Sequence, residues 1–304
     1  MAIARGRAGE ELGVEVGAGA EAREARQVAR RRAYRAIPIT IGLAMIVGMI
    51  VVAIAAPLIA PFSPSAQFST AVLKGPGAVE GHWLGTDEYG RDLLTRILWG
   101  TRVSLQVGVL AVLVAFAIGV PLGIAAGYVG GGTDLAVMRF MDMLLAFPTL
   151  LLALLIVTAL GGSLTNEILA IGIALTPNFA RLARSLALSI KENDYIMAAR
   201  ALGSGQTRLM VRHIFPNAMY ALVVVGTLYV ATAIRTEAGL SFLGLGVPPP
   251  TASWGNILSE GRQYIKCCPW ITTFPGLAIM LAVLAFNLMG DALRDLLDPR
   301  LRGD

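Results

Sequence analysis

Six apolar stretches, each about as long as a membrane span, alternate with polar segments along the chain. They cover about 37–60, 103–128, 143–163, 165–186, 217–236 and 269–290. A helix needs roughly 20 apolar residues to cross the hydrocarbon core of a bilayer. Helices are expected because lipid offers no partner for backbone N–H and C=O groups, and because these stretches do not alternate as barrel strands do. The pattern predicts an all-α integral membrane protein with six transmembrane helices.

The fourth apolar stretch is the least regular of the six. Its uninterrupted part, Ile168 to Ala180, is short, and Arg181 and Arg184 close it. We place both arginines at the cytoplasmic end of the span. Prolines inside four of the stretches can kink their helices. They are Pro121, Pro148, Pro177 and Pro275.

Lysine and arginine set the orientation of the spans, because they are enriched in cytoplasmic segments. With the N-terminus inside, 18 of the 25 Lys and Arg residues fall in cytoplasmic segments and 7 fall outside. This bias predicts that both termini are cytoplasmic. The chain then divides into a cytoplasmic tail at 1–36 and a transmembrane domain at 37–300, with long outer loops at 61–102 and 237–268.

Composition agrees with a membrane protein. Of the 304 residues, 56% are hydrophobic and 15% are charged, whereas soluble domains carry about 25% charged residues. The net charge of +5 calls for no nucleic-acid partner, because topology explains the basic residues. Cys267 and Cys268 are adjacent in the second outer loop. They either form a strained vicinal disulfide, pair with a partner, or stay free thiols.

The sequence lacks the residues that three other classes of protein require. An intramembrane hydrolase requires a nucleophile beside a base, or a metal, but the only histidines, His82 and His213, fall on opposite sides of the membrane. No GxxxxGK(S/T) phosphate loop occurs, so the chain itself is not expected to hydrolyse ATP. A channel should show rings of charge or a filter, which the spans do not offer. We expect a non-enzymatic protein with no catalytic, cofactor-binding or metal-binding residues.

Gly119, Gly123 and Gly127 recur at four-residue spacing in the second apolar stretch. This spacing places all three on one face of a helix, where another helix can approach closely. We predict a helix-packing face, which is either a moving interface along a pathway or ordinary tight packing.

A polar segment at 192–216, between the fourth and fifth spans, has the pattern of a helical hairpin. Asp194 is a candidate N-cap, and Gly203 suits the left-handed position after a helix end. Ser204 is a candidate cap for a second helix, which is expected to stop at Pro216. So regular a hairpin in a loop is typical of an element that docks into a partner. The alternative is an amphipathic helix lying on lipid.

The first helix of this hairpin combines a small face with apolar side chains. Ala198, Ala199 and Ala201 form the small face. Met197 stands where a Glu would complete a capping box with Asp194.

The outer loops contain two glycine-rich motifs. The first motif is Trp83-Leu84-Gly85-Thr86-Asp87 followed by Gly90-Arg91-Asp92, and the second is Gly239-Leu240-Ser241-Phe242-Leu243-Gly244-Leu245-Gly246. We expect Thr86 to cap a helix that starts near Asp87, and Asp92 to pair with Arg91 or Arg96. The loops either receive an external partner or only plug and brace the outer face.

Several motifs together resemble a known family. Met197-Ala198-Ala199, followed by Gly203 and by Ile214-Phe215-Pro216, resembles the coupling motif of importer permeases of the ATP-binding-cassette class, in which Glu usually comes first. The two outer-loop motifs resemble signatures of the dipeptide/oligopeptide/nickel permeases. So do Asn287-Leu288-Met289-Gly290-Asp291-Ala292-Leu293-Arg294-Asp295 and Asp298-Pro299. The resemblance covers about 37–300 and is strongest to the second, C-type permease subunit of such systems.

This resemblance implies the architecture of type I importers, in the cytoplasmic (inner) membrane of a bacterium or archaeon. It implies that the element coupling the chain to an ATPase comprises Met197, Ala198, Ala199, Arg200, Gly203, Ile214 and Pro216. It also implies that the outer-loop signature comprises Trp83, Leu84, Gly85, Thr86, Asp87, Gly90, Arg91, Asp92, Gly244 and Gly246.

The resemblance further implies partners. A second homologous permease would complete the pathway, two cytoplasmic ATPases would bind ATP and Mg and each receive one hairpin, and an external solute-binding protein would deliver the substrate. We expect dipeptides or short oligopeptides as substrate, with nickel chelates, glutathione-like peptides and some sugars left open. With Met197 in place of Glu, the first hairpin helix is expected to be less well capped by about 0.5–1 kcal/mol. Coupling is expected to survive because Asp194 is present.

Overall fold

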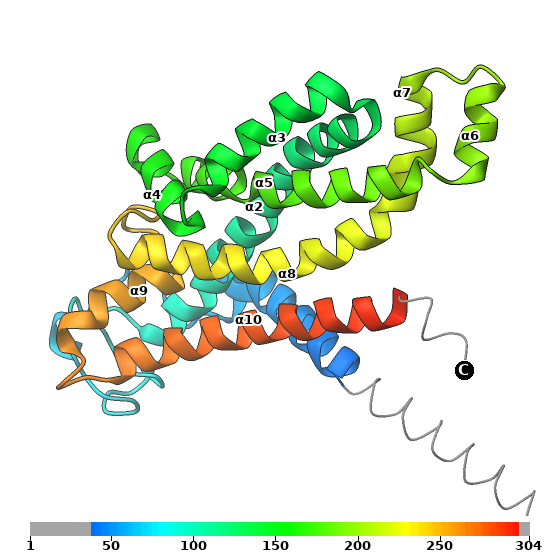
Figure 1. Cartoon of the computed structure of the whole chain (residues 1–304). Helices are drawn as coiled ribbons and strands as arrows, with labels where there is room; N and C mark the ends of the chain where they lie inside the picture. Colours follow the sequence, from blue (N-terminus) through cyan, green and yellow to red (C-terminus); the bar gives the residue numbers. More distant parts are fainter. Residues whose placement is uncertain (1–37, 298–304) are drawn as a thin grey trace, which may run out of the picture.

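The computed structural model describes residues 38–297 (Figure 1). Every regular element in this part of the chain is a helix, and the one isolated β-bridge joins Thr86 and Asp92. The expected all-helical class is therefore confirmed for the described residues. The predicted tail at 1–36 and the Asp298-Pro299 end of the C-terminal motif lie outside them.

Residues 38–297 form one helix at their N-terminal end, six further long or medium helices, and several short ones. The N-terminal helix is Pro38–Ile59. The others are η1 (Ser69–Ala71), α2 (Leu93–Val129), α3 (Gly131–Leu145), α4 (Thr149–Leu160), α5 (Leu164–Ile190), α6 (Asp194–Ala201), α7 (Gln206–Leu209), the π-helical turn η2 (Met210–Ile214), α8 (Phe215–Phe242), α9 (Trp254–Gly261), η3 (Arg262–Tyr264) and α10 (Trp270–Leu297).

Four helices in the described residues are long and apolar enough to cross a membrane. They are Pro38–Ile59, Leu93–Val129, Gln206–Phe242 and Trp270–Asp295, and a fifth span results if α3 and α4 are counted as one bent span. The fourth predicted stretch forms a long helix, α5, but this helix is less apolar and is not among the four. Glu167, Arg181 and Arg184 lie within it. The count of six spans therefore stays a prediction.

The third apolar stretch, 143–163, is not one straight helix. α3 ends at Leu145, α4 begins after Pro148, and the two helices meet at 90°. Proline cannot donate a backbone hydrogen bond and disfavours the helical conformation of the residue before it, so the break falls where the chain places Pro148.

The second membrane helix begins ten residues earlier than its predicted start at 103. The Asp92 carboxylate accepts a hydrogen bond from the Thr95 backbone N–H at 2.8 Å and caps α2. α2 therefore extends ten residues beyond the predicted span at this end, and the bounds of the first outer loop stay a prediction. The expected cap at Thr86 is wrong, because the Thr86 hydroxyl instead donates to the Ala71 carbonyl.

The second hairpin helix does not stop at Pro216. α7, the π-helical turn and α8 follow one another without a break, and Pro216 lies in the first turn of α8. Pro216 directly follows the π-helical turn, in which the Phe215 N–H donates to the Met210 carbonyl, so the helix widens just before the residue that has no N–H to donate. The second hairpin helix is thus the N-terminal extension of the long helix that contains the fifth apolar stretch.

The centre of the bundle is the contact between α2 and α5. A Cβ atom at Gly119 or Gly127 would lie 2.6 Å from the carbonyl oxygens of Thr176 and Arg184, respectively. At Gly123 a Cβ would collide with the carbonyl oxygen of Ala180. The three glycines therefore lie on one face and let the two helix backbones touch, which any side chain would prevent.

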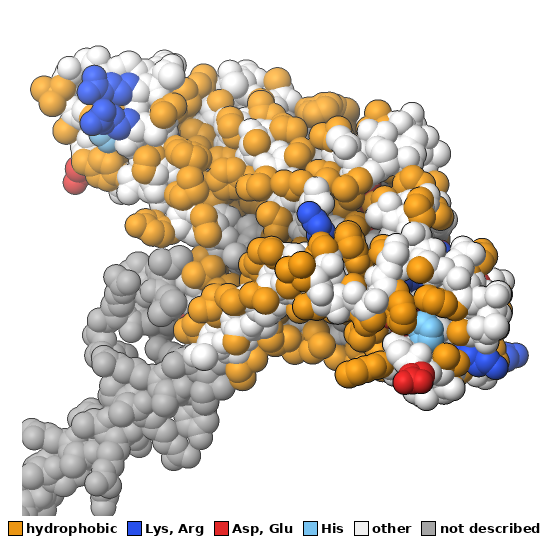
Figure 2. All heavy atoms as spheres, turned by 180° about the vertical axis from the view of Figure 1, so that it is seen from behind, with side chains coloured by type: hydrophobic (Ala, Val, Ile, Leu, Met, Phe, Trp, Pro, Cys, Tyr) orange, Lys and Arg blue, Asp and Glu red, His pale blue; other side chains and the backbone are white. Residues whose placement is uncertain are grey.

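Hydrophobic side chains cover most of the long middle of the face shown in Figure 2, whereas Lys and Arg side chains gather mainly near its two ends. Many large apolar side chains on the long helices are exposed, among them Ile54, Leu113, Leu155 and Met280. This distribution fits a protein whose middle faces lipid or other membrane helices.

Candidate functional site

The hairpin 192–216 projects from the end of the bundle opposite α9 (Figure 1). Ile196 and Leu209 are fully buried and anchor its two helices. In contrast, Leu202 at the turn is 89% exposed, and the Met197 side chain is half exposed. The hairpin therefore offers an apolar tip that nothing in the described chain covers.

Backbone geometry at the hairpin differs from the expectation at one end and agrees at the other. Asn193, not Asp194, is the N-cap of α6, and its side chain makes no capping hydrogen bond. Gly203 has φ +83°, and the Gly203 and Ser204 N–H groups donate to the Arg200 and Ala199 carbonyls at 3.0 and 3.1 Å. This is the left-handed helix end that Gly203 suggested. The second helix is capped at Gly205 rather than at Ser204.

The shift in N-cap changes the meaning of Met197. With Asn193 as N-cap, Met197 is the fourth helical residue, and a capping box needs its Glu at the third. A Glu at 197 would not complete the box, so the expected loss of capping energy does not apply. Of the other residues carried over by resemblance, Ala198 and Pro216 are exposed, Ala199 packs against the core, and Ile214 is buried.

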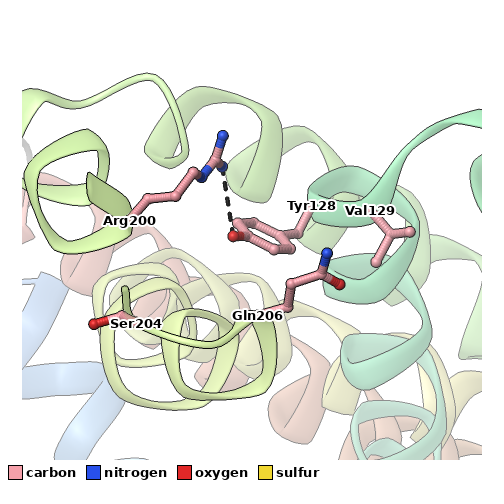
Figure 3. Close-up of a pocket in the computed structure, with 5 residues that line it drawn as sticks. All are labelled: Tyr128, Val129, Arg200, Ser204 and Gln206. Carbon is pink, nitrogen blue, oxygen red and sulfur yellow. Dashed lines mark hydrogen bonds between the residues drawn. The ribbon is translucent and has the colours of Figure 1, made fainter. Parts of the chain in front are cut away.

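A polar pocket of about 300 Å³ lies where the hairpin meets the end of α2 (Figure 3). It is lined by Tyr128, Val129, Arg200, Ser204 and Gln206. The Arg200 guanidinium donates to the Tyr128 hydroxyl at 3.4 Å and lies 5.5 Å from the centre of its ring. The Lys191 ammonium donates to the Gly127 carbonyl at 3.0 Å, so the base of the hairpin is also tied to α2.

Asp87 is the hub of the outer-loop signature at the other end of the molecule. Its buried carboxylate accepts from Arg91 Nε at 2.6 Å, from Arg96 at 2.5 Å, and from the Tyr89 and Arg91 backbone N–H groups. Glu260 on α9 accepts from the same two arginines at 2.8 and 2.6 Å. These pairs fasten the first outer loop and the start of α2 to the second outer loop.

Asp92 does not pair with Arg91 or Arg96 as expected. Its carboxylate contacts His82 Nδ1 at 2.9 Å and caps α2. Phe62 and Phe68 pack on the His82 ring with centroids 5.0 and 5.1 Å away. The neighbouring Glu88 has one carboxylate oxygen without a hydrogen-bond partner, and its burial raises the pKa of the carboxyl group.

The signature glycines permit close backbone approach. Gly85 and Gly90 have φ +84° and +72°, and a Cβ at either would meet the backbone of Lys74 or Phe68. Trp83, in contrast, is 74% exposed. Most of the first motif thus has a bracing role in the described structure, and Trp83 is the member that faces outward.

The second motif folds over a buried polar cluster. Ser104 and Ser241 donate to the two carboxylate oxygens of Glu237 at 3.0 and 3.1 Å. Gly246 packs against Ser241 with no space for a side chain, and the exposed Gly244 takes φ +82° at the turn. Nearby Glu167 is fully buried, and neither of its oxygens meets hydrogen-bond geometry, although the Val247 backbone N–H is directed towards it.

Sequence reasoning missed Glu167, Glu237 and Glu260. Each is an isolated carboxylate in a long segment, and its partners are distant in sequence; Glu260, for example, is 164 residues from Arg96. The one available signal was the presence of Glu167 and Glu237 in or beside apolar stretches, where ionisable residues are costly and mark special sites.

Comparison with known proteins decides the family. Residues 119–303 match the family described as the inner membrane component of binding-protein-dependent transport systems. The chain belongs to this permease family. Residues 26–76 of the permease also match the N-terminal transmembrane domain of oligopeptide transport permease C. The resemblance to C-type permeases that the sequence motifs indicated is thereby confirmed.

Curated relatives align along most of the permease. It is 49% identical over 230 residues to a dipeptide transport system permease protein of Alkalihalophilus pseudofirmus, covering 76% of this chain and 75% of the relative. Identity is 45% to a di/tripeptide permease of Pseudomonas aeruginosa, covering 81% and 82%. It is 46% to a glutathione transport permease of Pectobacterium atrosepticum, covering 74% and 75%.

Solved structures show the same fold. The permease superposes on a chain of the MetNI methionine ABC transporter in an inward-facing conformation with a TM-score of 0.55 at 20% identity, covering 68% of this chain and 97% of that chain. Because the chain belongs to the permease family, it is a multi-pass, inner-membrane transport subunit and not an enzyme.

Proposed function

We propose that this permease forms, with a second homologous permease, the pathway of an ATP-driven importer of dipeptides or short oligopeptides. The observation that carries this proposal is the 49% identity to a dipeptide permease over 230 residues. The projecting hairpin 192–216, with its exposed apolar turn, supports it from the structural side.

The proposed complex contains two cytoplasmic ATPases and an external solute-binding protein. ATP and Mg belong to the ATPases, since the sequence lacks a phosphate-binding loop. Each ATPase receives one permease hairpin. For this chain the proposed contact set is the exposed side of Met197, Ala198, Leu202 and Gly203. Closure of the ATPase dimer then displaces the hairpin, and the pathway changes from inward-facing to outward-facing.

The proposed topology has six spans and cytoplasmic termini. The 18-to-7 distribution of Lys and Arg supports it, as does the division of the chain into helices. In this arrangement α5 is the fourth of the six spans. Its charged residues are accommodated because Glu167 is buried, and Arg181 and Arg184 pair with Asp142 and Asp134 of α3.

Glutathione is the second candidate substrate, because one relative at 46% identity is named as a glutathione permease. Glutathione is itself a small peptide, so a similar pathway suits both. Nickel chelates are a further candidate substrate for an importer of this kind.

The first experiment is a gentle detergent purification of the permease from its native membrane, with identification of the proteins that accompany it. We expect a second permease and two ATPases. Recovery of the chain alone, active in liposomes without ATP, would contradict the proposal and favour a channel or a secondary carrier.

The substrate is tested with the complete complex in liposomes. Accumulation of a labelled dipeptide should require ATP and the solute-binding protein, and unlabelled tripeptide should compete with it. If glutathione accumulates and the dipeptide does not, the second candidate is correct.

A further inference from the structure

The pocket between the hairpin and α2 is rich in hydrogen-bond donors and contains no negatively charged hydrogen-bond acceptor. Arg200 makes one long hydrogen bond, to Tyr128, and no ion pair with any described residue. The Gln206 amide makes no hydrogen bond within the described chain, and no Asp or Glu lines the pocket. Figure 3 shows Arg200 and Gln206 on either side of the Tyr128 ring.

The surroundings of the pocket are also positively charged. Within the hairpin 192–216, Arg200, Arg208 and Arg212 outnumber Glu192 and Asp194, which gives a net charge of +1, and Lys191 directly precedes the hairpin. A guanidinium in a donor-lined pocket pairs best with a carboxylate, which accepts several charge-assisted hydrogen bonds. The pocket therefore has the chemistry of a socket for an acidic side chain.

We propose that this pocket receives an Asp or Glu side chain of the cytoplasmic ATPase, which pairs with Arg200. This inference rests on the proposed function and adds a defined contact to it. An ATPase is favoured over a lipid headgroup because the pocket is formed by the projecting hairpin, whose turn carries the 89% exposed Leu202.

The same contact would link the ATPase to the interior of the permease. Arg200 rests on Tyr128 in the last turn of α2, and α2 touches α5 through backbone atoms at Gly123 and Gly127. A carboxylate bound to Arg200 would thus lie one side chain away from α2. The pair of Arg200 and this carboxylate gives the ATPase a second contact with the permease, in addition to the apolar turn of the hairpin.

The test measures binding of purified ATPase subunits to the two-permease complex in nanodiscs made of neutral lipid. Arg200→Glu is compared with Arg212→Glu, which makes the same charge change at another exposed arginine of the hairpin. We expect Arg200→Glu to weaken binding about tenfold or more, which is the scale of one charge-assisted pair at an interface. Arg212→Glu should change it by less than about twofold, and Arg200→Lys should lie between.

Other outcomes overturn the proposal. Equal weakening by both reversals would mean that net charge acts without a specific socket. A defect of Arg200→Glu that occurs only in nanodiscs with anionic lipid would assign the pocket to a headgroup. If the wild-type complex binds no ATPase, the proposed function itself fails, whereas equal binding by wild type and Arg200→Glu refutes only the socket.

Discussion

Gly123 leaves less space for a Cβ than Gly119 or Gly127, because a Cβ there would overlap the Ala180 carbonyl. We predict that Gly123→Ala lowers stability by about 1–3 kcal/mol, the usual cost of forcing an extra methyl into a packed contact. Thermal unfolding in detergent, followed by intrinsic fluorescence, measures the effect.

Gly226 provides the matched control for that substitution. It lies in the middle of α8, and a Cβ there would meet its nearest neighbour at an ordinary 4.0 Å. Gly226→Ala should be neutral or slightly stabilising, since alanine is the better helix residue. Equal destabilisation by both variants would show that the α2–α5 contact is not specially tight.

Asp87 is the second residue whose loss should be severe. Asp87→Asn leaves Arg91 and Arg96 with less negative charge in a buried site, which costs about 3 kcal/mol or more when one member of a buried pair is removed. Thermal unfolding should show a clear drop in midpoint. The exposed Glu80→Gln in the same loop should change stability by less than about 0.5 kcal/mol; a similar drop there would contradict the hub role of Asp87.

At the scale of elements, Met197 can be judged by its position in α6. Because residue 197 is one position beyond the capping box, Met197→Glu should leave the stability of the permease within about 0.5 kcal/mol of wild type. ATP-dependent uptake by the reconstituted complex should persist in both proteins. An inactive wild type that Glu restores would show that the ATPase requires an acidic group at this position, with Met197→Gln as the uncharged control.

Helix identity was largely predictable from sequence, and helix boundaries were not. Apolar stretches of span length locate the N-terminal helix, α2, α8 and α10 because burial in lipid and helix formation require the same run of residues. The start of α2 was missed because Arg96 and Arg102 interrupt the apolar run there, although Asp92 caps the helix and Leu93 is buried in a small apolar cluster. The helix was expected to end at Pro216 because proline usually ends a helix. The sequence alone does not show that Pro216 lies in the first turn of α8.

The candidate sites show the same division between local and distant information. Gly203 was assigned correctly, because a left-handed helix end depends on neighbouring residues alone. The pairing of Arg91 and Arg96 with Glu260 depends on folding that brings α9 onto α2, and no local pattern encodes it. The Arg200 pocket likewise joins residues 72 positions apart.

At the scale of the whole molecule, the proposed topology places the hairpin in the cytoplasm and the Asp87 hub outside. We predict that green fluorescent protein fused to the C-terminus fluoresces, because it matures in the cytoplasm. Alkaline phosphatase inserted at the exposed Pro248 should be active, because it folds outside. The opposite pattern for the pair would reverse the orientation inferred from Lys and Arg.

The right-angle bend between α3 and α4 has a consequence for the surroundings of the permease in the bilayer. The Ala146 and Phe147 N–H groups still donate to the Asp142 and Leu144 carbonyls, so the bend leaves the last carbonyls of α3 and the first N–H groups of α4 without partners inside a helix. Hydrocarbon cannot solvate such peptide groups, so non-helical backbone at membrane depth requires protein or water next to it. In the proposed topology the third span begins on the cytoplasmic side at about 143, so the bend lies at the edge of the bilayer, where headgroups and water rather than acyl chains can solvate the backbone groups that the break leaves free.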